Sequence, residues 1–410
     1  MKKPLSIGLA SALLAGVASA DGLYYVGAEA KESMPLKWVV GLDVTYDDNV
    51  TPNTGNGDED AFSINPYVGL SVVSITPQTS WDVYARVGAL YYLNDVKGQS
   101  DDLYPQARVG ANVTHRFNER VRVSSRNFLA YELEPDYSYG FATSRQNDPY
   151  LYWQTDNSVG YRWSERFATY TGFILTGLDY DSEVENSDRF TWTIYNQFRY
   201  QLSPQTVLTA EYRYSETDGD GFAADSTDQY ALVGVEHRFS PNSILIARVG
   251  AQFREVDDSG DDSTSPYAEI ATTTRVNEVF TVRAFLRYGL EAYDTVQTIG
   301  AGIYDFSEKE TLRIGVSAEY AISPMLALFG GVDYIPATYD EGNRVGGSVL
   351  APDSVSGYDE DLVNAYIGLS VKFTEYLSGS LTYNFTNSES DFENRDYDRN
   401  RVTVGVRAEF

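Results

Sequence analysis

The sequence predicts an all-β fold, a transmembrane antiparallel up-and-down β-barrel of about 18 strands. Three observations predict it. Apolar and polar residues alternate along many segments, aromatic residues gather near the ends of those segments, and short turns alternate with long polar connections. Apolar residues at helical spacing are absent after residue 20.

The composition of the 410-residue chain restricts the classes of function. It contains 33 Tyr and 33 Gly, a bias toward strands and turns. It contains no Cys, which excludes disulfides, thiolate zinc sites and cysteine nucleophiles. The formal net charge of −28 argues against nucleic acid as a partner, because binding to phosphates needs basic surfaces.

The N-terminal 20 residues are predicted to be a secretory signal peptide. Two lysines precede an apolar run, and Ala18-Ser19-Ala20 has the small-residue pattern of a cleavage site. We therefore expect export, with a mature chain that begins at Asp21. No apolar run after Asp21 reaches 18 residues, so the mature chain can cross a membrane only as a closed β-barrel.

The alternation is clearest in the C-terminal segment. Val402, Val404, Val406 and Phe410 share one face there, and polar residues share the other. Thirteen segments with this pattern hold nineteen charged residues, all on the polar face, where random placement would divide them about evenly. These segments are 38–46, 62–73, 81–92, 107–117, 207–214, 230–239, 244–254, 280–290, 312–320, 326–334, 362–373, 377–385 and 402–410, and five less regular strands are expected near 121–132, 149–162, 167–180, 188–202 and 264–276.

Aromatic placement and turn spacing distinguish a membrane barrel from a soluble sandwich. Rings on the apolar face lie near segment ends, as Trp38 and Tyr46 do, and aliphatic residues occupy the centres. This favours a lipid-facing band between two aromatic girdles. Eight short turns, such as "RFNER" (116–120) and "RFSPN" (238–242), delimit nine hairpins and therefore 18 strands, with residues 293–310 interpreted as a loop. Sixteen strands is the alternative.

The chain resembles a Gram-negative outer-membrane β-barrel and is similar to the putative β-barrel porin families. The resemblance rests on the signal peptide, the repeated "RFSPN"-type turns and the C-terminal strand that ends in Phe410. It implies an outer-membrane location, with Phe410 as a signal for the barrel-assembly machinery and with outer-membrane lipid and lipopolysaccharide as partners. It implies no cofactor. We expect residues 21–36 to form a short periplasmic lead and residues 37–410 to form the barrel.

No catalytic site is expected. The two histidines, His115 and His237, precede two of the short turns at equivalent positions, on the register that faces lipid. Equivalent places in two hairpins favour an interfacial structural role over that of a catalytic base. A catalytic base needs a positioned nucleophile and an orienting partner.

Charged residues on the polar register are the candidate pore-lining residues. From the rise and tilt of barrel strands, Arg213, Arg248, Arg283 and Arg287 fall near mid-height on neighbouring strands. One hypothesis is a basic stripe that holds an anionic solute or sets a transverse field against glutamates. The alternative is that the charges pair and keep the lumen wet. The full candidate set is Arg213, Arg248, Arg254, Arg283, Arg287, Arg313, Lys372, Arg407, Glu211, Glu236 and Glu319.

The expected loops carry most of the acidic residues. The nineteen charges in the clear strands sum to +5, so the acidic excess lies in the connections and the less regular strands. Asp257, Asp258, Asp261 and Asp262 form a dense run and are candidate ligands for a divalent cation that bridges to lipopolysaccharide. Their "DDSGDD" sequence lacks the spacing and the final Glu of an EF-hand loop. The alternative is a solvated acidic surface.

The longest expected loop spans residues 336–361 and contains an apolar patch from Val345 to Ala351. A loop of this length in a barrel is often functional, and it either folds into the pore or lies across its mouth. Together these features predict a passive pore for small hydrophilic solutes. The main alternative is a non-conducting surface protein whose acidic loops serve adhesion or envelope integrity. The charged polar register disfavours a channel for hydrophobic solutes.

Overall fold

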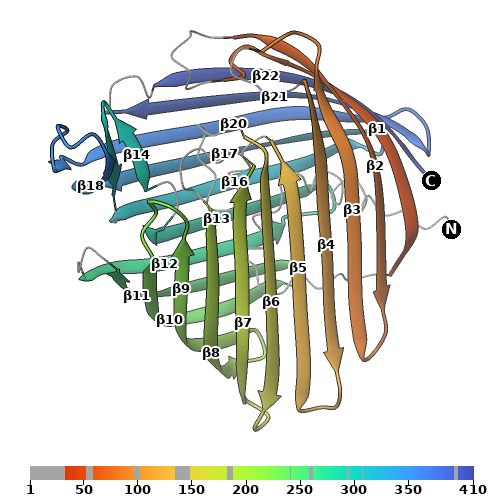
Figure 1. Ribbon diagram of the computed structural model, residues 1–410. Coiled ribbons are helices and arrows are strands. Elements are labelled where there is room, and N and C mark those ends of the chain that lie inside the picture. Colours follow the sequence, from red (N-terminus) through yellow and green to blue (C-terminus); the bar gives the residue numbers. More distant parts are fainter. Residues whose placement is uncertain are drawn as a thin grey trace.

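The computed structural model describes residues 33–51, 59–96, 102–133, 148–181, 188–240, 242–257, 262–292, 295–306, 308–391 and 396–410. Within these residues the chain forms 22 strands, and 18 of them make one closed antiparallel sheet (Figure 1). The last strand pairs with the first, from Val39 opposite Glu409 to Asp47 opposite Arg401, and this pairing closes the barrel. No helix in the described part of the chain is long and apolar enough to cross a membrane.

The barrel strands are 12 to 15 residues long, and a tilted strand needs about 9–11 residues to cross the hydrocarbon of a bilayer. The strands therefore extend beyond the membrane. They are β1 (Met34–Asp47), β2 (Ala61–Ile75), β3 (Thr79–Tyr92), β4 (Leu103–Arg116), β5 (Val121–Glu132), β6 (Tyr150–Arg162), β7 (Phe167–Tyr180), β8 (Arg189–Ser203), β9 (Thr206–Gly219), β10 (Ser226–Ser240), β11 (Ser243–Val256), β12 (Asp262–Arg275), β13 (Phe280–Glu291), β16 (Lys309–Ser323), β17 (Leu326–Tyr339), β20 (Tyr358–Lys372), β21 (Leu377–Ser390) and β22 (Tyr397–Glu409).

The two ends of the barrel differ in their connections. Eight connections of two to four residues join strands at one end, here called the turn end, and the longer connections join them at the other, the loop end. Strand β1 begins and β22 ends at the turn end, where Trp38 and Phe410 exchange backbone hydrogen bonds of 3.0 and 2.8 Å. The prediction of an 18-strand up-and-down barrel is therefore confirmed, and the alternative of sixteen strands is wrong.

Apolar side chains cover the outside of the barrel. On β1, Trp38, Val40 and Leu42 are 44% to 49% exposed, whereas Asp43 and Thr45, which follow them on the alternate register, face the interior. The alternation predicted from the sequence thus separates a lipid-facing surface from a polar interior. Exposed rings form the predicted girdles, with Phe117, Trp163, Phe239, Tyr376 and Phe410 at the turn end and Phe62, Tyr91, Phe190 and Phe253 toward the loop end.

Two long connections at the loop end form a second, smaller sheet. Strands β14 (Val296–Ile299), β15 (Gly302–Asp305), β18 (Gly342–Gly347) and β19 (Ser354–Val355) pair in this order, and we call them the loop sheet. In Figure 1 its β14 and β18 lie at the end of the molecule away from the C-terminus. The segment 293–310, interpreted as a loop, adds no strand between β13 and β16, as predicted, but it contains the two short strands β14 and β15 of the loop sheet.

Two other predicted boundaries also change. The expected loop 336–361 is shorter in the structure, because β17 and β20 stay paired out to Tyr339 opposite Tyr358. The barrel begins at Met34 rather than at residue 37, since β1 includes the last three residues that were expected in the periplasmic lead. Both changes have one cause, which is that the strands continue past the band of clear alternation.

Candidate pore and its polar interior

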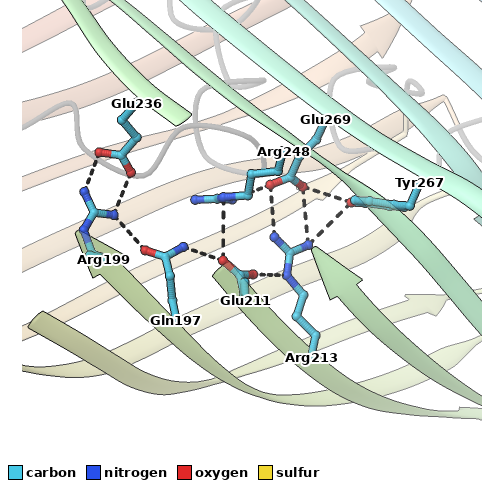
Figure 2. Close-up of polar contacts among 8 residues, drawn as sticks. All are labelled: Gln197, Arg199, Glu211, Arg213, Glu236, Arg248, Tyr267 and Glu269. Atoms are coloured by element: carbon cyan, nitrogen blue, oxygen red, sulfur yellow. Dashed lines mark hydrogen bonds and ion pairs between the residues drawn. The ribbon is translucent and has the colours of Figure 1, made fainter. Parts of the chain in front are cut away.

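A connected set of charged side chains lines the interior of β9 to β12. Arg213 and Arg248 each contact both Glu211 and Glu269 (Figure 2). Arg213 Nη2 lies 3.0 Å from Glu269 Oε1, and Arg248 Nε lies 3.6 Å from Glu211 Oε2. The four residues meet because Glu211 and Arg213 share one face of β9, while Arg248 stands directly opposite Glu269 on paired strands. The Tyr267 hydroxyl also donates to Glu269, at 2.9 Å.

The same network continues onto β8 and β10. Gln197 donates to Glu211, and Arg199 donates to the side-chain amide oxygen of Gln197 at 2.7 Å and to Glu236 at 2.6 Å (Figure 2). The network therefore joins three arginines and three glutamates, and its formal charges cancel. We call these residues, with Gln197 and Tyr267, the interior network.

This charge balance decides between the basic stripe and paired charges as interpretations of the arginines near mid-height. The side chain of Arg248 is 5% exposed and that of Arg213 is 16% exposed, and each contacts two carboxylates. The hypothesis of a basic stripe is therefore wrong for these two residues, because paired charges at such burial present no net positive wall. Arg287 belongs to the same surroundings, since it stands opposite Glu269 in the β12–β13 register.

Two further pairs extend the balanced wall toward the loop end. Arg254 holds Asp228 with two hydrogen bonds of 2.9 Å, and Arg313 holds Glu291 with bonds of 2.7 and 2.9 Å. All four side chains are 5% exposed or less. Two parallel bonds from a guanidinium to a carboxylate fix the geometry of both partners, so this wall is rigid as well as neutral.

The remaining candidate residues lie on the interior register at several heights. Arg283 and Glu319 are half-buried on β13 and β16, and Lys372 is exposed at the turn end of β20. Arg407 donates to a serine hydroxyl of β21 at 2.9 Å. Lys372 and Arg407 both stand opposite Ser378, on the two sides of β21, whereas Arg283 lies apart from them on β13.

The opposite wall of the interior is more open. Arg86 on β3 lies 3.0 Å from Asp43 on β1, and their side chains are 38% and 24% exposed. Arg126 and Asp156, on β5 and β6, lie 3.8 Å apart and are 26% and 21% exposed. The guanidinium of Arg86 also stacks over the Tyr67 ring, 3.7 Å from its centroid. The charged groups of these two pairs are therefore more accessible to water than Arg248, Glu211 and Glu269 of the interior network, whose side chains are 5% to 9% exposed.

Apolar side chains from opposite walls meet at the loop end. Tyr150 and Tyr152 of β6 pack in one buried cluster with Ile335 of β17 and Leu362 of β20. Strands β6 and β17 are nine places apart in the ring of 18, so they face each other across the interior. We call this cluster, which also contains Ala130 and Leu178, the aromatic bridge. It divides the loop end of the interior.

The loop sheet covers the interior on one side of the aromatic bridge. The connection that contains β14 and β15 reaches β8, where Arg189 Nη2 donates to Thr295 Oγ1 at 3.2 Å. On β18 a Cβ on Gly346 would lie 2.7 Å from the ring of Phe222, so this strand lies close against the β9–β10 connection. Two connections that start on β13 and β17 thus extend across the mouth to β8–β10.

Rings anchor the loop sheet to the barrel. Phe306 meets Tyr339 and Tyr358 edge-on, with centroids 5.7 and 5.3 Å apart, and the two tyrosines stack at 4.3 Å. Buried rings in edge-on and stacked pairs stabilise a packed state beyond their buried area. Of the apolar patch 345–351, Val349 and Leu350 instead project from the tip, 83% and 92% exposed.

The two histidines lie in matching surroundings. The Nδ1 atom of His115 is 2.8 Å from Thr79 Oγ1, and that of His237 is 2.9 Å from Thr206 Oγ1. Each ring also meets the edge of the phenylalanine two residues later. The threonine contacts join neighbouring strands at the turn end, which is consistent with a structural role for the two histidines.

The acidic run at 257–262 is only partly described. Asp257 is exposed and Asp262 opens β12 opposite Glu255, whereas Asp258 and Asp261 lie outside the described residues. In the described part of the chain no three His, Asp or Glu residues are grouped to hold a metal ion. The cation site at this run remains a prediction.

Several residues of the interior ion pairs were not among the candidates predicted from the sequence. Asp228 and Glu291 fall just outside segments 230–239 and 280–290, and Glu269, Gln197 and Arg199 lie in less regular strands. All five continue the polar register of their own strand, and that signal was present in the sequence. The partner of each depends on the register between strands, which periodicity within one strand does not contain.

Comparisons with known proteins give only remote likenesses. No family model and no curated protein matches the chain. Pseudomonas aeruginosa OpdK with vanillate has 13% identity and a TM-score of 0.47, over 92% of this chain and 99% of that one. OccAB4 of Acinetobacter baumannii has 14% and 0.45, over 93% and 100%. A BenF-like porin from Pseudomonas fluorescens Pf-5 has 11% and 0.47, over 93% and 100%. The function of this barrel is therefore inferred from its own residues.

Proposed function

We propose that this protein is an outer-membrane channel for the passive diffusion of small hydrophilic solutes. The observation that carries the proposal is the contrast between the two surfaces of one closed sheet. Apolar side chains cover the outside, and charged pairs that water can reach line part of the inside. A barrel of 18 strands is wide enough to enclose an aqueous lumen.

The open wall supports a route for solutes. The pairs Arg86–Asp43 and Arg126–Asp156 lie on β1 to β6, away from the interior network and the loop sheet. A solute on this route passes both signs of charge, so the channel is expected to admit neutral and charged solutes without strong ion selectivity. Arg407 and Lys372 are proposed to line the same interior, and Arg283, Arg287 and Glu319 its opposite wall.

A second function is favoured by one specific feature. The aromatic bridge and the loop sheet occupy the loop end of the interior, which suits a barrel that does not conduct. In that case the protein serves adhesion or envelope integrity through its acidic loops. An acidic cavity of about 580 Å3 at the loop end, bordered by β20, β21, β22 and the β21–β22 connection, fits such a surface role.

Reconstitution in planar bilayers tests the two functions. Purified full-length protein, shown to be folded by its heat-modifiable migration on gels, is added to one side of the membrane. Stepwise conductance with weak ion selectivity is the result expected for the channel. A silent membrane with folded protein inserted contradicts the channel and leaves the surface function.

Export and assembly belong to the same proposal. Residues 1–20 lie outside the described residues, and cleavage after Ala20 remains a prediction. Phe410 directly follows the closing strand β22 and is 67% exposed, and its ring stacks on that of Tyr376 with the centroids 6.4 Å apart. This accessible ring supports the proposal that the barrel-assembly machinery recognises Phe410.

A further inference from the structure

A cavity opens inside the barrel at the turn end. Its volume is about 640 Å3, and strands β4 to β10 with their turns border it. Tyr170 and Val207 of its lining stand on the interior register, since the residues that follow them, Thr171 and Leu208, are exposed on the outer surface. The cavity therefore belongs to the mouth of the interior that lies opposite the loop sheet.

Arginine dominates the lining of this cavity. Seven arginines and three glutamates border it, an excess of four positive charges. The arginines come from different hairpins, so several strands place positive charge around one space. The β4–β5 hairpin supplies Arg116, Arg120 and Arg122, and the β6–β7 hairpin supplies Arg162 and Arg166. Arg199 of β8 and Arg238 of β10 complete the set.

Most of this charge is not neutralised by the protein. Arg199 is held by Glu236 as part of the interior network. Arg162 donates instead to the backbone carbonyl oxygens of Ser164 and Glu165, each at 3.1 Å. The side chains of Arg116, Arg120, Arg166 and Arg238 contact no carboxylate in the described part of the chain. The cavity thus differs from the charge-balanced wall directly above it.

We propose that this cavity binds a soluble anion that carries two or more carboxylate or phosphate groups. A guanidinium presents a planar fork of donors that matches a carboxylate or a phosphate, and it stays charged at every physiological pH. Arginines from separate hairpins surround the space, so a ligand with several anionic groups engages more of them than a chloride ion does. The glutamates at the turns, Glu119 and Glu165, limit the excess charge without removing it.

The charge at the other end indicates the side from which the ligand enters. The loop-end cavity is lined by six carboxylates and no basic residue, namely Asp359, Asp361, Glu389, Asp391, Asp396 and Asp398. These exposed carboxylates stand on the outer register of β20 to β22 and in their connection, beside the mouth, so anions are repelled from the loop end and attracted to the turn end. The ligand therefore approaches from the turn end, which is the periplasmic side in the orientation expected for this class of barrel. Binding there does not require an open pore.

Isothermal titration of the detergent-solubilised barrel tests the site. Citrate and pyrophosphate are the probes, and sucrose is the neutral control. Both anions are expected to bind, and Arg162→Gln is expected to weaken their binding about tenfold, the usual loss of one charge-assisted contact. The double variant Arg120→Gln/Arg166→Gln is expected to weaken it further.

A matched variant separates the cavity from general basicity. Arg275 makes the same contact with its turn, donating to the carbonyl oxygen of Glu278 at 3.2 Å, but it does not line the cavity. Arg275→Gln is expected to leave both affinities unchanged. Each variant is accepted only if it keeps the heat-modifiable migration of the folded barrel.

Three results overturn the proposal. The first is that neither citrate nor pyrophosphate binds to the folded barrel. The second is that Arg162→Gln and Arg275→Gln weaken binding equally. The third is that phosphatidylglycerol vesicles compete through the same arginines as strongly as pyrophosphate, which assigns the site to a lipid headgroup. Because the measurement needs no bilayer current, a silent bilayer contradicts the channel and not this site.

Discussion

Arg313 on β16 holds Glu291 on β13 with two hydrogen bonds, of 2.7 and 2.9 Å, and both side chains are 2% exposed. A pair this deeply buried is costly to break, because the remaining charge keeps its desolvation penalty and loses its partner. Glu291→Gln is expected to lower the free energy of unfolding by about 3–5 kcal/mol. Urea unfolding of the barrel in lipid vesicles, followed by tryptophan fluorescence, measures the change.

The double variant provides the decisive comparison. Glu291→Leu with Arg313→Met removes both charges at once, and we expect it to recover most of the loss, since paired apolar replacements are often neutral. Arg344→Gln is the control, because its partner Asp353 is 94% exposed. That surface pair is expected to contribute about 1 kcal/mol at most. Equal losses for the single and double variants would contradict the account of desolvation.

The aromatic bridge is expected to limit conductance. Tyr152→Ala removes a ring that joins opposite walls, so the variant should show a larger single-channel conductance than the wild type. Its stability should fall by about 3 kcal/mol, the usual cost of deleting a buried ring. Tyr320→Ala is the control, because Tyr320 is exposed on the outer surface. Unchanged current in Tyr152→Ala, with a conducting wild type, rules out the bridge as a constriction.

The sequence predicts the barrel well because each strand carries its own evidence. In β22 the alternation from Val402 to Ala408 follows from the environment of each face alone, and it needs no knowledge of the neighbouring strand. The loop sheet was missed for the opposite reason. Its β15 pairs with β18 nearly 40 residues later, and strands of four to six residues show too little periodicity to predict. The ion pair between Arg248 and Glu269 was not predicted, because it depends on the pairing register between β11 and β12.

Packing of the loop sheet is expected to weaken as pH rises through the acidic range. Asp305 on β15 is 5% exposed, and burial raises the pKa of its carboxyl above the ordinary value of 3.8, although Thr295 and Arg189 oppose the shift. A raised pKa means that the packed state binds the proton more tightly than the opened state does. The packed sheet is therefore favoured at low pH and loses stability as pH rises from about 3.8 through the folded pKa.

Replacement of Asp305 by asparagine tests this pH dependence. The amide is neutral at every pH, so Asp305→Asn should keep the loop sheet packed at neutral pH and remove the acid dependence. Hydrogen exchange of residues 295–306, corrected for the intrinsic effect of pH, measures the opening. Asp353→Asn is the control, since that carboxylate is 94% exposed. Opening that is independent of pH in the wild type would contradict the prediction.

Phe410 is expected to matter for assembly in the cell and little for the stability of the finished barrel. Its ring is 67% exposed, and its two hydrogen bonds to Trp38 come from the backbone. Phe410→Ala therefore leaves strand closure intact, and the free energy of unfolding of the refolded variant should differ from that of the wild type by about 0.5 kcal/mol or less, as is usual for exposed substitutions.

In cells, the fraction of folded barrel in the outer membrane should fall strongly if the assembly machinery recognises the ring of Phe410. Phe373→Ala, which removes a 55% exposed ring at the same end, is the matched control and should assemble normally. Equal assembly of the two variants would show that Phe410 is only one more ring of the turn-end girdle.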